Sequence, residues 1–443
     1  MARAGKLDGR QPCSSVSMTM RWPHHPAPAS ERTPSRARLG AGLVTGAADD
    51  DPSGIATYSQ AGAQFGLATL WTVWFTLPLM VGIQAVCGHV GRVTGRGLAA
   101  NMGQLFPRSL TVAVVALLLV ANVFNLAADI GAMGEAASML LGGNGALYAL
   151  ALAAVSVLLE VAVPFVRYAR VLKLLTISLF AYVLTAVVVH VPWAAALRHL
   201  VLPTPRLDRA YLVTIVAMFG TTISPYMFFW QAAQEVEEEE QAQEEPLLLQ
   251  PSQAPRSFHR IDVDTVVGMA LSNVVGFFVV LVAAVVLHGH GITAIHSAAD
   301  AAQALRPLAG PLAGAVFATG IIGTGLLAIP VLAGSGAYAL AEACRWSYGL
   351  DRRLGEAKLF YLIIVLATVA GALLSLSSVQ PMRMLFWAAV LNGVVSVPLM
   401  AAVMVLATRT KVMGALVVKG WLRACGWLAT AAMAVVVVAM FFG

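Results

Sequence analysis

The sequence predicts an all-α membrane protein with about eleven transmembrane helices, arranged as a five-plus-five inverted repeat. Three observations support this fold class. Hydrophobic residues make up 59% of the 443-residue chain and charged residues only 11%, with a mean hydropathy of +0.78, which is far from the balance of a soluble globular protein. Apolar runs long enough to cross a bilayer recur along the whole chain. Two of these runs are interrupted by a proline in matching places.

The apolar runs give the expected helices in chain order, and the first and the sixth contain the interruptions. The eleven runs span residues 39–66, 67–88, 110–141, 146–163, 171–191, 212–233, 263–287, 312–341, 357–376, 384–406 and 422–442. The first ten helices form a predicted transporter core at 39–410, with repeats at about 39–192 and 210–407. An additional C-terminal helix is expected within 411–443.

The positive charges predict the orientation of the chain. If the N-terminus is cytoplasmic, 23 of the 28 Lys and Arg residues fall in cytoplasmic segments, as the positive-inside rule requires. We therefore expect a multi-pass protein of the cell membrane with a cytoplasmic N-terminus. This asymmetry explains the net charge of +6 and gives no reason to expect a nucleic-acid partner. The lipid bilayer is the expected environment, and the chain is expected to be a monomer.

Two hydrophilic segments lie outside the expected helices. Residues 1–38 contain Pro, Ser and Arg without an apolar core and are predicted to form a disordered basic cytoplasmic tail. Residues 234–262 are predicted to form an acidic cytoplasmic loop, because the run EVEEEE begins at Glu235. We expect this loop to be solvated, with metal collection or regulation as the less favoured alternative. The cysteines are widely spaced and form no disulfide or metal-binding pattern: Cys13, Cys87, Cys344 and Cys425.

The first interruption is the run DDDPSG, residues 49–54, inside the first apolar run. Proline removes a backbone donor, so the carbonyls around it lose their helical partners and can face a cavity that binds a cation. An ordinary proline kink requires no carboxylates, so this run favours a cation site. Asp51, immediately before Pro52, is best placed as a ligand. Asp50 is a second candidate, and Asp49 is expected to face a vestibule.

The second interruption is the run GTTISPY, residues 220–226, in the sixth helix. Taken alone, Pro225 is better explained as an ordinary kink. However, each break falls in the first helix of a five-helix block, and matching broken helices in inverted repeats mark the binding site of a transporter. The expected ligands are oxygens, which suit Mg²⁺, Ca²⁺ or Mn²⁺. The candidate ligands and lining residues are Asp51, Asp50, Ala48, Gly54, Thr222, Ile223, Ser224 and Tyr226.

Three further polar residues inside predicted helices are candidates for the ion pathway. Asp129 lines a water path or stabilises helix packing, and Glu135 has the same two interpretations. Asn392 faces the site or makes an interhelical hydrogen bond, and the hydrogen bond is slightly favoured. The HGH run at residues 288–290, with His296 nearby, is a weak candidate for a late-metal site. No nucleophile–base pair suggests an enzyme, and no cofactor is expected.

These motifs resemble the Nramp family of divalent-metal transporters. The resemblance rests on Asp-Pro-Ser-Gly with the following IATYSQAGAQFG, on VTGRGLA after the second helix, on Asp129, and on the break in the sixth helix. It covers roughly residues 39–410. Membership would imply the fold of amino-acid and metal symporters, a metal site between the two breaks, and alternating access.

The sequence also departs from the family motifs. The usual helix-one motif is Asp-Pro-Gly-Asn, and Gly54 replaces the Asn; the usual helix-six motif is Met-Pro-His, and Ser224 and Tyr226 replace Met and His. Loss of the thioether weakens discrimination in favour of soft transition metals. A roomier site suits hydrated Mg²⁺, so the chain looks like the Nramp-related magnesium-transporter branch. Mn²⁺ also accepts a site made only of oxygens.

Proton coupling is expected to be weak or absent. The family carries an Asp followed three residues later by a Glu in helix three, whereas here Asp129 is followed by Ala132 at that spacing. The leading hypothesis is therefore a transporter of Mg²⁺, Mn²⁺ or both, with little or no proton coupling. A proton-coupled Mn²⁺/Fe²⁺ symporter, an organic-solute symporter and a membrane metal sensor remain the alternatives.

Overall fold

The structure is a computed structural model that describes residues 40–163, 177–350 and 352–442, and every regular element within them is helical. The predicted tail at 1–38 lies outside these residues, as does part of the predicted fifth helix. Nine helical stretches of the described residues are long and apolar enough to span a membrane. The number is smaller than eleven for two reasons. The second half of the first helix continues through a 3₁₀ turn into the next helix, and the fifth is represented only by the shorter apolar stretch Ile177–Val188.

The longer helices match the predicted runs in order. They are α1 Ala41–Asp49, α2 Pro52–Phe65, α3 Leu70–Thr94, α5 Arg108–Leu141, α6 Gly145–Ala162, α8 Phe180–Val188, α10 Arg209–Thr222, α11 Pro225–Ala242, α12 Ala254–Val282, α15 Ala313–Cys344, α16 Lys358–Ser375, α17 Pro381–Thr408 and α19 Gly420–Phe442. Short helices connect them: α4 Leu98–Leu105, α9 Trp193–Val201, α13 Ala298–Ala302, α14 Arg306–Ala309 and α18 Thr410–Met413.

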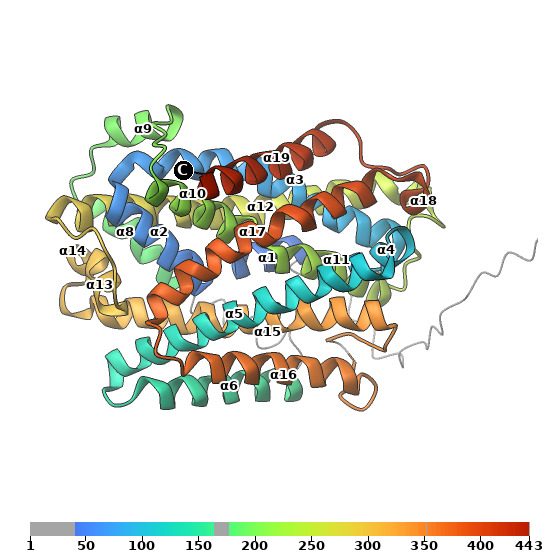
Figure 1. Cartoon of the computed structure of the whole chain (residues 1–443), viewed down its shortest axis with the longest axis horizontal. Coiled ribbons are helices and arrows are strands. Elements are labelled where there is room, and N and C mark those ends of the chain that lie inside the picture. Colours follow the sequence, from blue (N-terminus) through green and yellow to red (C-terminus); the bar gives the residue numbers. More distant parts are fainter. Residues whose placement is uncertain (1–39, 164–176, 351, 443) are drawn as a thin grey trace, which may run out of the picture. The chain divides into compact units, whose positions relative to one another are not determined.

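Both predicted helix breaks are confirmed. Helix one stops at Asp49 and resumes at Pro52, and helix six stops at Thr222 and resumes at Pro225. Each proline is the first residue of its second half-helix, where a missing N–H group costs nothing. The two broken helices run in opposite directions, α1 to α2 one way and α10 to α11 the other (Figure 1). This opposition agrees with the predicted inverted repeat.

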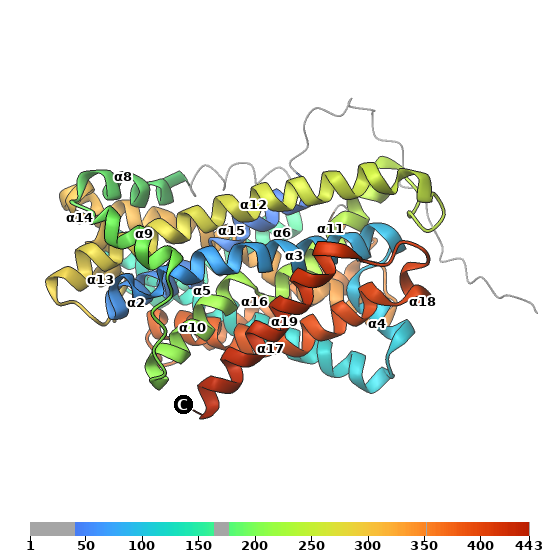
Figure 2. The same ribbon diagram turned by 90° about the horizontal axis from the view of Figure 1, so that it is seen from above.

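Helix α12 supports both halves of the first broken helix. A Cβ atom on Gly46 would lie 2.3 Å from the carbonyl of Gly268, so α1 can approach α12 this closely only because position 46 is glycine. On the other side of the break, α2 packs against the π-helical end of α12, Ala283–Leu287. A Cβ on Gly62 would likewise collide with the carbonyl of Val280. Figure 2 shows α12 running alongside α3.

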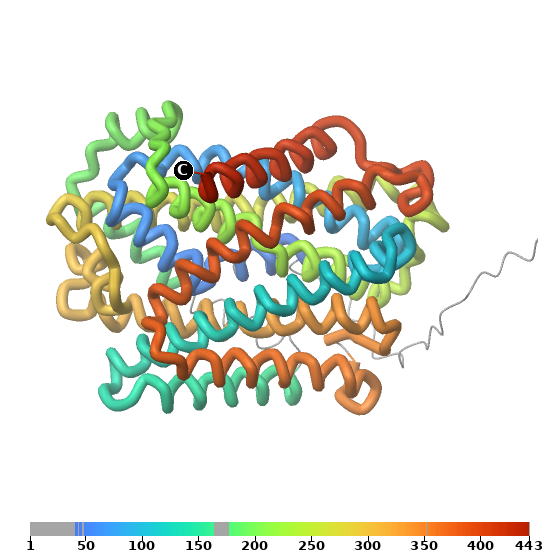
Figure 3. The backbone as a smooth tube through the Cα atoms, in the orientation of Figure 1, coloured from blue at the N-terminus to red at the C-terminus, as the bar shows by residue number. Residues whose placement is uncertain are grey.

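The other long helices enclose the breaks. Helices α5, α15, α16 and α6 pack against one another, as the backbone trace in Figure 3 also shows. Helix α17 contacts α5 and α10, and α19 covers α17 and α3. Both halves of each broken helix therefore lie between two pairs of helices, α12 and α3 on one side and α15 and α17 on the other.

The acidic run that follows the second break is not the solvated loop that we expected. Helix α11 continues to Ala242, so residues 235–240 are helical, and Glu235 and Glu239 are buried. Both have arginine partners from neighbouring helices. Arg92 Nη1 lies 2.9 Å from Glu239, and Arg260 pairs with Glu235. The prediction failed because a run of glutamates, taken alone, indicates a solvated segment. The arginines that pair with the buried glutamates lie in other helices, and the run itself gives no sign of them.

Candidate metal-binding site

The side chain of Asp51 is held in place as the N-cap of α2. Its Oδ1 atom accepts hydrogen bonds from the N–H of Gly54 and from the hydroxyl of Ser53, both at 2.7 Å. An aspartate is among the best residues for this position because it satisfies a free N–H group of the first turn. The carboxylate also meets the positive end of the α2 dipole. The DDDPSG run thus fixes the direction of one carboxylate at the break.

The two prolines release two carbonyls, and each carbonyl finds a hydroxyl. Pro52 cannot donate to the carbonyl of Ala48, which instead accepts a hydrogen bond from Tyr226 at 3.3 Å. Pro225 cannot donate to the carbonyl of Thr221, which instead accepts from Ser224 at 3.0 Å. The Tyr226 hydroxyl is also 3.3 Å from Oδ2 of Asp51. Tyr226, from the second break, thus contacts two oxygens of the first.

The remaining candidates around the second break lie differently from expectation. The Ser224 hydroxyl also donates to Gly220 at 2.7 Å, and the Thr222 hydroxyl donates back into α10, to Met218 at 3.0 Å. Ile223 is buried between the half-helices. Thr221, which the sequence analysis did not select, brings its hydroxyl within 3.5 Å of Ser53. No sequence motif indicates which of Thr221 and Thr222 faces the first break. Their side chains point in different directions because of where α10 ends, and only the structure shows this.

Gly54 lies beside both breaks. A Cβ atom at this position would be 3.2 Å from the carbonyl of Asp49 and 3.3 Å from the Thr221 hydroxyl. Both distances are tighter than an ordinary van der Waals contact, so a larger side chain would displace its neighbours. The absence of a side chain here leaves the carbonyls and the Asp51 carboxylate as the lining of the break.

Asp49 and Asp50 face helix α12 rather than the second break. The hydroxyl of Ser272 lies 2.5 Å from Oδ2 of Asp49 and 3.0 Å from Oδ1 of Asp50. Asp49 is 1% exposed, so the expectation that it faces a vestibule is wrong in this conformation. Ser272 was missed because a single serine in an apolar helix carries no sequence signal.

The pathway candidates occupy three different settings. Asp129, on α5, is fully buried, and neither of its carboxylate oxygens has a hydrogen-bond partner in the part of the chain that the structure describes. Glu135 instead accepts a hydrogen bond from the N–H of Ala298, at the start of α13, at 2.8 Å. Asn392 exchanges two hydrogen bonds with Asn125, at 2.9 and 3.1 Å, which links α17 to α5.

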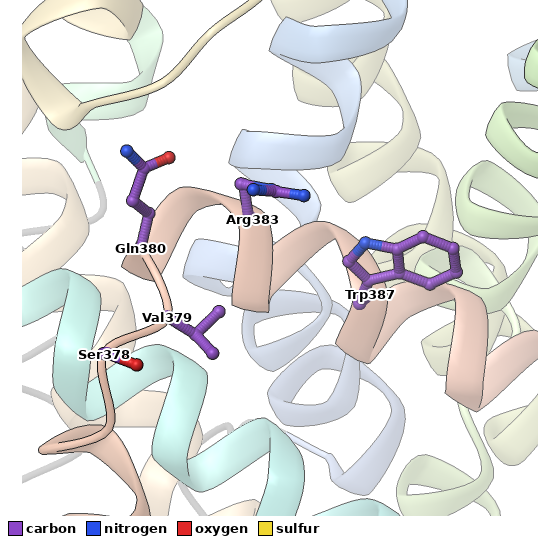
Figure 4. A pocket seen from close by; sticks show the side chains of 5 residues that line it. All are labelled: Ser378, Val379, Gln380, Arg383 and Trp387. Carbon is purple, nitrogen blue, oxygen red and sulfur yellow. The ribbon is translucent and has the colours of Figure 1, made fainter.

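No group of three or more His, Cys, Asp or Glu side chains is arranged to hold a metal ion among residues 40–163, 177–350 and 352–442. The imidazoles of His288 and His290 are each bonded to a backbone carbonyl. Any ion at the breaks would therefore bind carboxylate, carbonyl and hydroxyl oxygens together. A separate hollow at the start of α17 contains none of the predicted site residues (Figure 4); it is lined by Ser378, Val379, Gln380, Arg383 and Trp387.

Comparison with known proteins assigns the family. The family described as Nramp, natural resistance-associated macrophage protein-like, matches residues 42–443. The chain belongs to the Nramp family. A relative from Verminephrobacter eiseniae named divalent metal cation transporter MntH is 27% identical over 369 residues, which cover 79% of this chain and 80% of the relative. A relative of the same name from Aeromonas hydrophila is 26% identical over 65% of this chain and 69% of its own length.

Solved structures agree with the Nramp fold. A crystal structure of the Eremococcus coleocola manganese transporter has a TM-score of 0.71 at 16% identity, covering 91% of this chain and 87% of that one. MhsT in complex with L-phenylalanine has a TM-score of 0.62 at 13% identity, covering 93% of this chain and all of that one. The Nramp fold thus extends to an amino-acid-binding protein, so the fold alone does not determine the substrate.

Proposed function

We propose that this Nramp protein transports divalent metal cations across the cell membrane by alternating access, with its N-terminus in the cytoplasm. The observation that carries the proposal is the position of Asp51. Its carboxylate lies at the junction of two broken helices of opposite direction, beside the carbonyl of Ala48 that Pro52 releases. The printed names of the relatives, divalent metal cation transporter MntH, support the same class of substrate.

The donor atoms favour Mg²⁺ and Mn²⁺ as substrates. Asp51 and Ala48 offer a carboxylate and a carbonyl, both hard oxygen donors. Neither residue that replaces the family's Asn and Met, Gly54 or Ser224, offers an amide or a thioether. A small ion that keeps part of its water shell fits such a site because few direct ligands are required.

The Tyr226 hydroxyl marks where the ion would bind. It lies 3.3 Å from both Oδ2 of Asp51 and the carbonyl of Ala48. A hydroxyl proton shared by two acceptors occupies the position that a cation ligated by those two oxygens would take. Ion binding therefore requires the hydroxyl to turn its proton away from both oxygens.

We expect transport to be weakly coupled or uncoupled to protons. The membrane potential alone gives a divalent cation about 4.6 kcal/mol per 100 mV, from about 2.3 kcal/mol for each charge. Asp129 is the observation that favours the alternative, a proton-coupled Mn²⁺/Fe²⁺ symporter, because it is a buried acid without a described hydrogen-bond partner. The organic-solute symporter is disfavoured because Asp50 and Asp51 would repel a substrate carboxylate. A metal sensor on the same fold would bind ions without moving them.

The test is uptake into proteoliposomes that contain a pH-sensitive dye, with Mg²⁺ and with Mn²⁺, for the wild type, Asp51→Ala and Asp129→Asn. Entry of either ion without acidification, lost in Asp51→Ala and retained in Asp129→Asn, would support the uncoupled transporter. Mn²⁺ entry with acidification that Asp129→Asn removes would establish the symporter instead. Metal binding without flux would point to a sensor, and the absence of both binding and flux would reject divalent metals as substrates.

A further inference from the structure

The cluster formed by Asp49, Asp50 and Ser272 is not explained by the site at Asp51. The Ser272 hydroxyl lies 2.5 Å from Oδ2 of Asp49 and 3.0 Å from Oδ1 of Asp50. The distance between these two carboxylate oxygens is therefore at most the sum of the two. Asp51 points elsewhere, toward the first turn of α2 and Tyr226 on α11. Carboxylates thus lie on two sides of the same helix break.

The cluster has too few hydrogen-bond donors for its carboxylate oxygens. A hydroxyl has one proton, so Ser272 can donate to Asp49 or to Asp50 at one time, but not to both. Oδ1 of Asp49 is buried and has no hydrogen-bond partner within the described part of the chain. No Lys, Arg or His of the described residues forms a salt bridge with either aspartate. A buried carboxylate oxygen without a donor is costly, and a cation would satisfy it.

We propose that Asp49, Asp50 and Ser272 form a second binding site for the transported divalent cation, which the ion occupies in alternation with Asp51. The proposal rests on the proposed function, because it concerns the same substrate. Two carboxylates and a hydroxyl are the oxygen donors that Mg²⁺ and Mn²⁺ accept. Two divalent ions bound side by side would carry four positive charges, more than the three negative charges of the aspartates. We therefore expect a single ion that moves between the two sites.

The position of the cluster gives the second site its role. It lies between α12 and the half of helix one that begins at Ala41, one turn beyond the close contact of Gly46 with Gly268. With the N-terminus in the cytoplasm, this half-helix lies on the cytoplasmic side of the break. An ion that leaves Asp51 toward the cytoplasm therefore meets Asp50 and Asp49 first. Asp50, 9% exposed, is the most accessible of the three aspartates.

The test is Mn²⁺ binding to the purified full-length chain in detergent, followed by loss of the electron paramagnetic resonance signal of free Mn²⁺. The key variant is Asp51→Asn, because asparagine removes the charge but still caps α2. We expect one Mn²⁺ per chain in the wild type, and one in Asp51→Asn with roughly tenfold weaker affinity. This residual binding should disappear when Asp49→Asn or Ser272→Ala is added.

Two further variants separate a site from a folding defect. Ser272→Thr in the Asp51→Asn background keeps the hydroxyl and should keep the residual binding. Thr430→Ala in the same background removes a buried hydroxyl that bonds Gly426 within α19, so it should leave residual binding unchanged.

Three results would overturn the proposal. If Asp51→Asn is monodisperse and binds no Mn²⁺ while the wild type binds and transports it, the second site fails and the proposed function stands. Residual binding that survives both Asp49→Asn and Ser272→Ala would also reject this site. A wild type that neither binds nor transports Mn²⁺ or Mg²⁺ would reject the second site together with the proposed function.

Discussion

The hydroxyl of Tyr226 lies 3.3 Å from Oδ2 of Asp51, and this contact joins the two broken helices at their interruptions. The same hydroxyl is 3.3 Å from the carbonyl of Ala48, which has lost its helical donor to Pro52. The one proton of this hydroxyl is therefore shared between the two oxygens that the proposed cation would use. The tyrosine and the cation compete for one position.

Replacing Tyr226 with phenylalanine tests this competition. Tyr226→Phe leaves a buried carboxylate oxygen and a buried carbonyl without their donor, so the ion-free protein should lose about 1 kcal/mol of stability. Mn²⁺ should then stabilise the variant more than it stabilises the wild type, because the ion no longer has to displace a hydroxyl. Thermal unfolding in detergent, with and without Mn²⁺, measures both quantities.

Tyr211→Phe is the matched control, since Tyr211 is also a buried tyrosine that donates to a carbonyl, that of Ala68 at 3.1 Å. It should lower the melting temperature without changing the increment that Mn²⁺ adds. A larger Mn²⁺ increment in the wild type than in Tyr226→Phe would mean that the hydroxyl helps to bind the ion rather than competing with it.

Asp51 has two roles that substitutions can separate. Its carboxylate is the proposed ligand, and its Oδ1 atom caps α2 through Gly54 and Ser53. Asp51→Asn keeps a capping oxygen, whereas Asp51→Ala removes it and should cost about 1 kcal/mol more in stability. Both variants should lose Mn²⁺ uptake. Uptake in proteoliposomes and thermal unfolding would be compared, and transport by either variant at the wild-type rate would exclude Asp51 as a required ligand.

The breaks could be predicted from the sequence because their cause is local. Pro52 and Pro225 act on carbonyls four residues earlier, and Asp51 caps the helix that starts at its own neighbour. Ser272 and Arg92 could not be predicted in the same way. Each meets its acidic partner more than 140 residues away in the sequence, so only the packing of α1 on α12 and of α3 on α11 reveals the pairing. The glutamates of α11 are predicted to form a solvated loop for the same reason, because their arginine partners lie far away in the sequence.

The missing side chain at Gly54 should influence selectivity. In Gly54→Asn, the new Cβ would press on the Asp49 carbonyl and the Thr221 hydroxyl. The amide would also offer the ion a direct ligand in place of a retained water. Mg²⁺ depends on retained water more than Mn²⁺ does, so the ratio of Mg²⁺ to Mn²⁺ uptake should fall roughly tenfold, equivalent to about 1.4 kcal/mol. Gly103→Asn is the control, because a Cβ there meets nothing within 4 Å. An unchanged ratio in Gly54→Asn would remove this position from the selectivity argument.

The ion pair between Arg92 and Glu239 should stabilise the packing of α3 against α11. Both side chains are almost fully buried, and their nitrogen and oxygen atoms are 2.9 Å apart. Arg92→Met leaves Glu239 buried without its cation, which should cost about 3–5 kcal/mol. Adding Glu239→Gln removes the stranded charge and should recover a large part of that loss, since replacing both members of a buried pair is often close to neutral.

The exposed pair of Arg352 and Glu240 provides the comparison. Their charged atoms are 3.6 Å apart, and the side chains are 35% and 55% exposed, so solvent screens the attraction and Arg352→Met should cost no more than about 1 kcal/mol. Chemical denaturation of the wild type, Arg92→Met, Glu239→Gln and the double variant would give the coupling free energy of the buried pair directly. If Arg92→Met were as mild as Arg352→Met, the α3–α11 contact would depend on its apolar side chains, and the buried arginine would contribute nothing measurable to stability.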